Sequence, residues 1–258
     1  MGPEANTLET SEDAVLGGRL RLRQPLRGHR VGHDAILLAA ATDARTGQHA
    51  VDLGAGVGGA GLALAVRVDG LKITLVEIDP ALCALAQDNA RLNRLDDRVG
   101  VLLGDAESLQ AFAAAGLSAG SVDRVLMNPP FNDARRQNVS PDPSRRLAHV
   151  GEPGLLARWV ATAAWLLGPQ GVLTLIWRAD GLADVLEALS GDFGSIAVLP
   201  VLPRPEAPAI RVLVRAVKGG RAKPVTVRGL ILNDAQGRPT AAAEAVLRGG
   251  DTLMVTEV

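Results

Sequence analysis

The sequence contains very few aromatic residues: three Trp, three Phe and no Tyr in 258 residues. Proteins that bind single-stranded nucleic acid by stacking successive bases need several exposed aromatic side chains. The scarcity therefore excludes recognition through a broad aromatic platform. It leaves room for a site that stacks one base.

Cysteine is almost absent as well. The single residue of this type, Cys83, cannot form an internal disulfide or complete a zinc site. A disulfide-stabilised secreted module and a cysteine-ligated metalloprotein are therefore excluded, and the composition suits a reducing cytoplasm. Cys83 lies on the helical pattern ALCALA, so we expect it to pack in the core. We predict no metal site.

Only one long stretch lacks charge. Residues 159–177 contain no charged side chain, which is long enough to resemble a membrane span. Gly168, Pro169, Gln170 and Gly171 interrupt this stretch, so we interpret it as a helix, a turn and a strand. The acidic, polar start of the chain does not have the pattern of a signal peptide. We expect a cytoplasmic protein that does not contact the membrane.

The net charge of −1 hides an uneven distribution. Residues 17–33 hold five Arg and no acidic residue, and residues 204–228 hold seven Lys or Arg against Glu206 alone. Two basic segments on an otherwise acidic chain attract a polyanion locally. Long basic side chains also solvate ordinary surfaces, so charge alone leaves nucleic-acid binding open.

Strands and helices alternate along most of the chain. Apolar, β-branched runs predict seven strands, at 49–53, 72–78, 98–103, 122–127, 171–177, 195–200 and 210–217. Helical patterns fall near 57–67, 80–94, 106–116, 153–167 and 179–190. Asp79 and Pro80 form a helix start. The alternation predicts an α/β fold with a mostly parallel, seven-stranded, doubly wound sheet whose ligand lies at the carboxyl ends of its strands.

No repeat and no Ser/Gly linker divides the chain. We expect a disordered N-terminus over residues 1–16 and a single domain over residues 17–258. Within this domain, a strand and helix extension covers residues 17–48 and a C-terminal extension covers residues 218–258.

A glycine-rich turn follows the first predicted strand, in the sequence Asp52-Leu-Gly54-Ala-Gly56-Val-Gly58-Gly59. It fits G-x-G-x-x-G, the pattern with which a turn and a helix N-terminus hold a dinucleotide pyrophosphate. It also fits D-x-G-x-G-x-G. An acidic residue directly before the glycines repels a pyrophosphate yet can engage the ammonium group of S-adenosylmethionine, so Asp52 favours that cofactor.

Two more acidic residues follow the next predicted strands. Glu77, at the end of the second strand, can accept hydrogen bonds from both hydroxyls of a ribose. Asp105, which precedes Ala106 in the sequence LGDA after the third strand, can reach an adenine amino group. Together with Asp52, they predict one cofactor site at consecutive strand ends.

The fourth predicted strand runs into Asn128-Pro129-Pro130-Phe131. Two consecutive prolines can neither continue a strand ladder nor enter a helix interior, so this segment is stiff and extended. We expect the Asn128 side-chain oxygen and the Pro129 carbonyl to point at one place, with Phe131 beside them. Such a geometry suits a planar amino group.

Over roughly residues 17–250, the chain resembles the class I S-adenosylmethionine-dependent methyltransferases, a Rossmann-like fold, whose NPP[FY] motif marks methylation of a planar amide or exocyclic nitrogen. Residues 24–41, residues 145–150 and the C-terminal segments are similar to those of the bacterial tRNA1(Val) adenine-37 N6-methyltransferase family. The resemblance implies a target base held by residues 128–131. It implies a cofactor site lined by Asp52, Gly54, Gly56, Glu77, Asp105 and Ala106.

The implied reaction is methylation of adenine N6 in an RNA, above all tRNA. Two other enzymatic targets stay open: a glutamine amide in a release factor and guanine N2 in rRNA. The release-factor enzymes usually have a longer helical N-terminal domain than the 51 residues that precede Asp52. An inactive RNA-binding scaffold is an alternative of another class, which the intact cofactor and NPPF motifs disfavour.

Arginines near these motifs are expected to contact RNA phosphates. Residues 132–152 show no periodic pattern, and a long loop beside a site is usually functional or disordered. We predict contacts from Arg27, Arg30, Arg135, Arg136, Arg145 and Arg146. Asp34, which precedes an apolar helical run, is expected to cap that helix.

Overall fold

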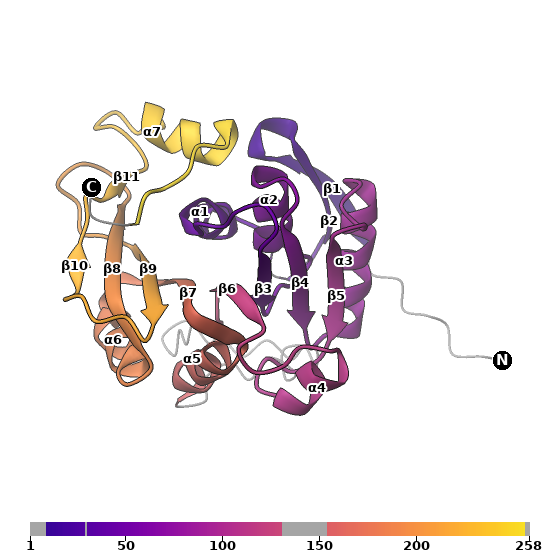
Figure 1. Cartoon of the computed structure of the whole chain (residues 1–258). Coiled ribbons are helices and arrows are strands. Elements are labelled where there is room, and N and C mark those ends of the chain that lie inside the picture. Colours follow the sequence, from indigo (N-terminus) through magenta and orange to yellow (C-terminus); the bar gives the residue numbers. More distant parts are fainter. Residues whose placement is uncertain (1–8, 29, 131–153, 256–258) are drawn as a thin grey trace.

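The computed structural model describes residues 9–28, 30–130 and 154–255. One central sheet has the strand order β5-β4-β3-β6-β7-β9-β8, and Figure 1 shows it between two layers of helices. All its long strands are parallel except β9, which pairs antiparallel with β7 and β8. These seven strands are β3 (His49–Leu53), β4 (Lys72–Glu77), β5 (Val99–Leu103), β6 (Val122–Met127), β7 (Leu167–Arg178), β8 (Phe193–Leu202) and β9 (Arg211–Lys218).

Each face of the sheet has its own apolar core. Along β6, Leu126 belongs to one core while Val125 and Met127 belong to the other, as the two-residue period of a strand requires. The first face is covered by α1 (His33–Ala41), α2 (Gly59–Arg67) and α3 (Pro80–Leu92). The second face is covered by α4 (Leu109–Ala114), α5 (Leu155–Leu166) and α6 (Leu182–Leu189), which follows the 3-10 turn η3 (Ala179–Gly181).

The predicted helix and strand boundaries agree with the structure at several points. Asp79 caps α3, because its side chain accepts a hydrogen bond of 2.8 Å from the amide of Ala81, and Pro80 is the first helical residue. The uncharged stretch 159–177 contains the expected helix and strand, but the predicted turn at residues 168–171 is instead part of β7, whose register with β6 shifts there. Within the described ranges, no helix is long and apolar enough to cross a membrane.

The expectation of a disordered N-terminus to residue 16 is wrong. β1 (Thr10–Val15) pairs antiparallel with β2 (Leu20–Pro25) across the 3-10 turn η1 (Leu16–Gly18). Leu16, Leu20 and Leu22 are at most 2% exposed and join the core that contains α1 to α3. This hairpin therefore belongs to the folded domain, while residues 1–8 lie outside the described residues.

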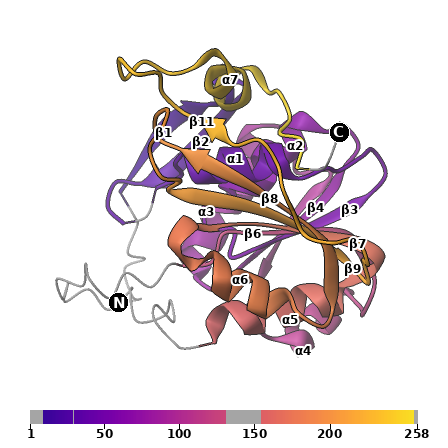
Figure 2. The ribbon, with the colours of Figure 1, turned by 90° about the vertical axis from the view of Figure 1, so that its left-hand side faces the viewer.

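The C-terminal extension adds two strands to the predicted seven. β10 (Val225–Thr226) and β11 (Leu230–Ile231) pair in parallel with the edge strand β8. The chain then continues into α7 (Ala241–Glu244) and the π-helical turn η4 (Ala245–Gly249), and Figure 2 shows α7 near the β1–β2 hairpin. Arg19 donates to the carbonyl of Gly249 at 3.3 Å, so both ends of the described chain are tied together.

Candidate active site

Four strand ends meet at one edge of the sheet. The register pairs Leu53 of β3 with Val76 of β4 and Met127 of β6, and it pairs Glu77 of β4 with Leu103 of β5. The strand order reverses between β3 and β6, which is where open α/β sheets bind ligands outside the carboxyl ends of their strands. The predicted site residues lie at or just after these ends: Asp52, Gly54, Gly56, Glu77, Asp105, Ala106, Asn128, Pro129 and Pro130.

The glycine-rich turn between β3 and α2 exposes bare backbone at one position. Gly56 has a φ of +57°, in the left-handed region that favours glycine. Its amide donates to Glu77 Oε2 at 2.8 Å, which fixes the turn against the end of β4. A Cβ built on Gly56 would meet nothing within 4 Å. The space above Gly56 is therefore open to the close approach of a ligand.

Asp52 lies at the end of β3 with only 2% of its surface exposed. Its Oδ2 accepts a hydrogen bond of 2.8 Å from the amide of Gly61, the third residue of α2. Burial raises the pKa of Asp52 to about 7, a rise that this hydrogen bond opposes and the nearby Glu77 carboxylate supports. The Asp52 side chain thus occupies a backbone amide at the N-terminus of α2, where a dinucleotide-binding protein binds a pyrophosphate. The arrangement disfavours a phosphate ligand and fits a cationic group.

Glu77 is held by three backbone amides. Its Oε1 accepts from Ile78 and Asp79, each at 2.9 Å, while its Oε2 accepts from Gly56. A carboxylate oxygen has two lone pairs, so Oε2 keeps an acceptor position for a further donor. The side chain is therefore both fixed in place and able to bind a ligand hydroxyl.

The loop after β5 is anchored to α5. Asp105 Oδ1 accepts a hydrogen bond of 2.9 Å from the amide of Glu107, and Ala106 between them is buried. Glu107 forms an ion pair with Arg158 of α5, with 2.7 Å between Oε2 and Nε. This pair holds the predicted adenine-binding residues against the helix that follows residues 131–153.

Asn128 follows β6 directly, and its side-chain oxygen is buried. Within the described part of the chain, Oδ1 has no hydrogen-bond partner. A buried acceptor left without a partner costs about 1 to 3 kcal/mol, and such atoms in native proteins call for a functional explanation. Pro129 is buried and Pro130 half-buried, so the backbone after this side chain is constrained. Phe131 lies outside the described residues.

The geometry can be compared with known families. A family model described as "Methyltransferase small domain" matches residues 29–200, more than half of the chain. The chain belongs to this methyltransferase family.

Three relatives with curated names show how far the similarity extends. The chain is 34% identical over 160 residues to the tRNA1(Val) (adenine(37)-N6)-methyltransferase of Porphyromonas gingivalis, a match that covers 60% of this chain and 61% of that protein. It is 28% identical over 224 residues to a protein of the same name from Shewanella amazonensis, covering 86% and 91%. It is 29% identical over 169 residues to the release factor glutamine methyltransferase of Chlorobaculum tepidum, covering 63% and 56%. The P. gingivalis match thus spans about three fifths of that relative's length.

Solved structures give the same fold. A crystal structure described as a predicted O-methyltransferase from Agrobacterium tumefaciens is 29% identical, with a TM-score of 0.73 over 87% of this chain and 100% of that one. TYW2 of P. horikoshii in complex with MeSAdo shares the fold, with a TM-score of 0.54 at 14% identity over 82% and 72%. The prediction of a Rossmann-like methyltransferase is confirmed, and S-adenosylmethionine is the cofactor that the family supports.

Two of the six arginines that were predicted to contact RNA lie in the described residues. Arg27 is exposed, and no ion pair or hydrogen bond of its side chain is found in the described ranges. Arg30, in contrast, forms an ion pair with Asp13 and donates to the carbonyl of Pro25 at 3.2 Å. Arg135, Arg136, Arg145 and Arg146 lie outside the described residues.

Two residues outside the predicted site were also given roles from the sequence, and the structure contradicts the first and confirms the second. Asp34 does not cap α1, because Gly32 occupies the cap position; it pairs with Arg211 of β9 at 2.9 Å. Cys83 is buried as expected, its thiol donates to the Glu77 carbonyl at 3.3 Å, and burial raises its pKa to about 11. Among the described residues, no group of three side chains could hold a metal ion.

Sequence reasoning missed two residues that support the glycine-rich turn. Trp159 of α5 lies against Gly54, and Asn89 of α3 donates to the carbonyl of Val57. Asn89 and Asn93 carry a readable signal, since two amides four residues apart share one face of a helix. The contact of Trp159 has no local signal.

Proposed function

We propose that this methyltransferase uses S-adenosylmethionine to methylate N6 of an adenine in tRNA. The observation that carries the proposal is the buried, unpartnered Oδ1 of Asn128 at the end of β6. It follows the strand next to β3, whose end forms the glycine-rich turn. An acceptor oxygen at this place suits the amino group of a base brought beside the cofactor.

The residues around the turn fit the parts of the cofactor by their chemistry. The open backbone at Gly56 leaves room for its amino-acid and ribose portions, and the spare acceptor of Glu77 suits a ribose hydroxyl. Asp105 suits an adenine amino group. Asp52, which has no basic partner among the described residues, suits the ammonium group, directly or through water. When bound, the cofactor supplies a methyl group on a sulfonium, which is an electrophile.

Asn128 and Pro129 would make the adenine amino nitrogen a better nucleophile. The lone pair of N6 is delocalised into the purine ring, so the planar amino group reacts poorly. Acceptance of its two hydrogens by Asn128 Oδ1 and the Pro129 carbonyl favours a pyramidal nitrogen and stabilises the positive charge that develops on it. No strong base is needed before attack, because the methylated cation is far more acidic than the amine. The site accordingly needs an amide and a carbonyl.

The choice of RNA rests on the relatives and on charge. The relatives from P. gingivalis and S. amazonensis are named as tRNA adenine-N6 enzymes, and Arg27 offers an exposed cation in the segment that follows β2. Extrusion of a base from an RNA stack costs a few kcal/mol. Stacking on Phe131 would return about 1 to 3 kcal/mol. One aromatic residue, in the NPPF motif, is therefore enough to hold the target base, which is consistent with the few aromatic residues of the chain.

A glutamine amide in a release factor is the second candidate, because the C. tepidum relative carries that name and an amide nitrogen needs the same two acceptors. Guanine N2 in rRNA would use them as well. An inactive scaffold would have no use for an unpartnered acceptor beside an open glycine turn.

Incubation with labelled S-adenosylmethionine separates these candidates. The enzyme is offered unmodified tRNA, rRNA or release factor, and the products are analysed as nucleosides or peptides. Label in N6-methyladenosine from tRNA is the expected result. Label confined to methylglutamine or to N2-methylguanosine would contradict the adenine assignment, and no transfer to any of the three would support a scaffold.

A further inference from the structure

Asn89 is a fully buried polar residue in the last turn of α3, and its side-chain amide makes three hydrogen bonds. Its Oδ1 accepts from the amide of Arg23 at 2.7 Å, and its Nδ2 donates to the carbonyl of Arg23 at 3.0 Å. The second hydrogen of Nδ2 goes to the carbonyl of Val57, also at 3.0 Å. Both amide donors are thereby used, and no other side chain of similar size offers the same set.

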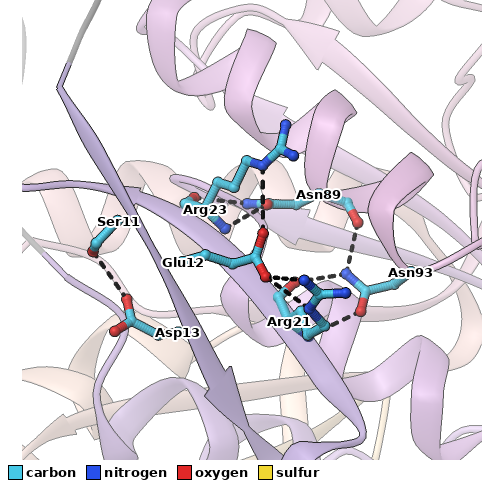
Figure 3. Close-up of polar contacts among 7 residues, drawn as sticks. All are labelled: Ser11, Glu12, Asp13, Arg21, Arg23, Asn89 and Asn93. Carbon is cyan, nitrogen blue, oxygen red and sulfur yellow. Dashed lines mark hydrogen bonds and ion pairs between the residues drawn. The ribbon is translucent and has the colours of Figure 1, made fainter.

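Asn93, one turn later, holds the same strand in the same way. It accepts from the amide of Arg21 at 2.9 Å and donates to the carbonyl of Arg21 at 2.7 Å, and Figure 3 shows both asparagines facing β2. Four residues of a helix rise about 6 Å, and two residues of a strand span about 6.6 Å. The spacing of the two side-chain amides therefore matches the spacing of the backbone groups of Arg21 and Arg23, and the amides bond the free edge of β2 in place of a neighbouring strand. On the other edge, Glu12 of β1 forms ion pairs with Arg21 and Arg23.

The two asparagines differ in one respect. The second hydrogen bond that Asn93 Nδ2 donates goes to the carbonyl of Asn89, within the same helix. Asn89 Nδ2 instead donates to the carbonyl of Val57 in the glycine-rich turn. Val57 follows Gly56, whose amide is bound by Glu77. Asn89 is thus a direct link between the β1–β2 hairpin and the turn at which the cofactor is expected.

A second contact joins the same two parts. The amide of Val31 donates to Gln24 Oε1 at 2.7 Å, which holds Val31 to the end of β2. A Cβ on Gly59 would lie 2.6 Å from Val31 Cγ2, so this side chain packs directly on the start of α2. The segment that leaves the hairpin therefore packs on the first residue of α2, while Asn89 binds the Val57 carbonyl within the turn that precedes it.

We propose that Asn89 is a positioning residue that couples the β1–β2 hairpin to the glycine-rich turn and thereby sets the affinity for S-adenosylmethionine. The inference rests on the cofactor site of the proposed function and adds a residue and an element to it. The Val57 carbonyl, held by Asn89, keeps the neighbouring Gly56 backbone in its open conformation. The hairpin is then part of the cofactor site, although it contributes no side chain to it.

A pair of matched variants tests this role. Asn89→Ala and Asn93→Ala each remove an amide that bonds both backbone groups of one β2 residue, but only Asn89→Ala frees the Val57 carbonyl. Isothermal titration should give a dissociation constant for S-adenosylmethionine raised about tenfold in Asn89→Ala and within twofold of wild type in Asn93→Ala. Thermal unfolding of both variants, measured without cofactor, corrects for the loss of stability that they share.

Hydrogen exchange of the unaltered chain provides a test that does not depend on folding of a variant. The amide of Arg23 is bonded to Asn89 and the amide of Arg21 to Asn93. Saturation with S-adenosylmethionine should slow exchange at Arg23 several-fold more than at Arg21, because only the Arg23 amide is linked through Asn89 to the turn. General stabilisation by a ligand would instead protect both amides alike, since it acts on all globally exchanging amides.

The outcomes separate this inference from the proposed target. A chain that binds S-adenosylmethionine but methylates no tRNA contradicts the target and leaves both measurements in place. Equal affinity of Asn89→Ala and wild type overturns the positioning role, whatever the substrate. Equal losses of affinity in the two variants, or equal protection of the two amides, would reduce Asn89 to a residue that only stabilises the hairpin.

Discussion

Gly54 and Trp159 meet at the glycine-rich turn: a Cβ on Gly54 would lie 2.5 Å from Cη2 and 2.9 Å from Cζ3 of the indole ring. Trp159 is 8% exposed and belongs to the core between the sheet and α5. Gly54 also has a φ of +70°. The first turn residue after β3 is therefore restricted to glycine both by its backbone and by a buried side chain that cannot easily move.

Gly54→Ala should lower the free energy of unfolding by about 2 to 4 kcal/mol, from backbone strain and overpacking together. Gly56→Ala is the matched control, because its φ is also positive but its Cβ meets nothing. It should lower stability by only about 1 kcal/mol while it weakens binding of S-adenosylmethionine at the open position. Urea unfolding and calorimetry measure the two effects. The double variant Gly54→Ala/Trp159→Leu should recover part of the lost stability, and a full loss in that variant would contradict the clash.

Asn128→Ala should lower kcat about a hundredfold to a thousandfold, as loss of a group that stabilises developing charge does. The dissociation constant for S-adenosylmethionine should stay within a few-fold, because the expected cofactor contacts lie on β3, β4 and β5. Single-turnover kinetics with saturating tRNA measure the first value and calorimetry the second.

The stability of the Asn128→Ala variant provides its control. Since Oδ1 of Asn128 has no partner in the described residues, its removal should leave the free energy of unfolding unchanged or raise it. A buried asparagine with all its hydrogen bonds, such as Asn89, should lose stability on the same substitution. A marked destabilisation by Asn128→Ala would assign this residue a structural role.

The position of the candidate site residues was largely predictable from the sequence because these residues lie at or just after strand ends. Asp52, Glu77, Asp105 and Asn128 each follow an apolar run, and parallel strands bring their carboxyl ends to one edge whatever the details of packing. The expected order of helices and strands from residue 49 to residue 218 follows from the same alternation.

The parts that sequence reasoning missed depend on partners far along the chain. The strand Thr10–Val15 buries no face completely, and β2 beside it is held by Asn89 and Asn93, which lie 66 and 72 residues from the groups that they bind. β10 and β11 have two residues each, too few for any periodicity. No local pattern reports such contacts, so β1, β10 and β11 could not be expected, whereas β2 is the strand that was expected within residues 17–48.

Asp52 should make the stability of the protein depend on pH. The folded-state pKa of Asp52, about 7, lies above the ordinary aspartate value of 3.8, so the stability that the protonated side chain contributes is fully present below pH 3.8 and is lost as the pH rises through 7. Asp52→Asn keeps an oxygen for the Gly61 amide and removes the titration. The difference in unfolding free energy between this variant and wild type should therefore grow in favour of the variant by about 2 kcal/mol from pH 5 to pH 7. It should level off above pH 8.

Urea unfolding of both proteins at half-unit steps of pH measures this difference, and effects of other titrating groups cancel in it. A difference that stays constant from pH 5 to pH 8 would mean that Asp52 is ionised throughout. S-adenosylmethionine at saturation should flatten the curve, because a neighbouring ammonium favours the ionised carboxylate.

Arg27 and Arg30 should differ in their effect on RNA binding, although both were predicted to contact phosphates. The Arg30 guanidinium is engaged by Asp13 and the Pro25 carbonyl, whereas Arg27 is exposed and has no such partner in the described ranges. Arg27→Gln should raise the KM for tRNA and lower the slope of log affinity against log salt by about 0.7 to 0.9, the value for one phosphate contact. Arg30→Gln should change the slope less, and because its ion pair is exposed it should change stability by no more than about 1 kcal/mol. Titrations of tRNA from 50 to 200 mM salt, about the range in which such slopes are measured, decide between the two. Equal slopes for both variants and wild type would remove the loop after β2 from the RNA-binding surface.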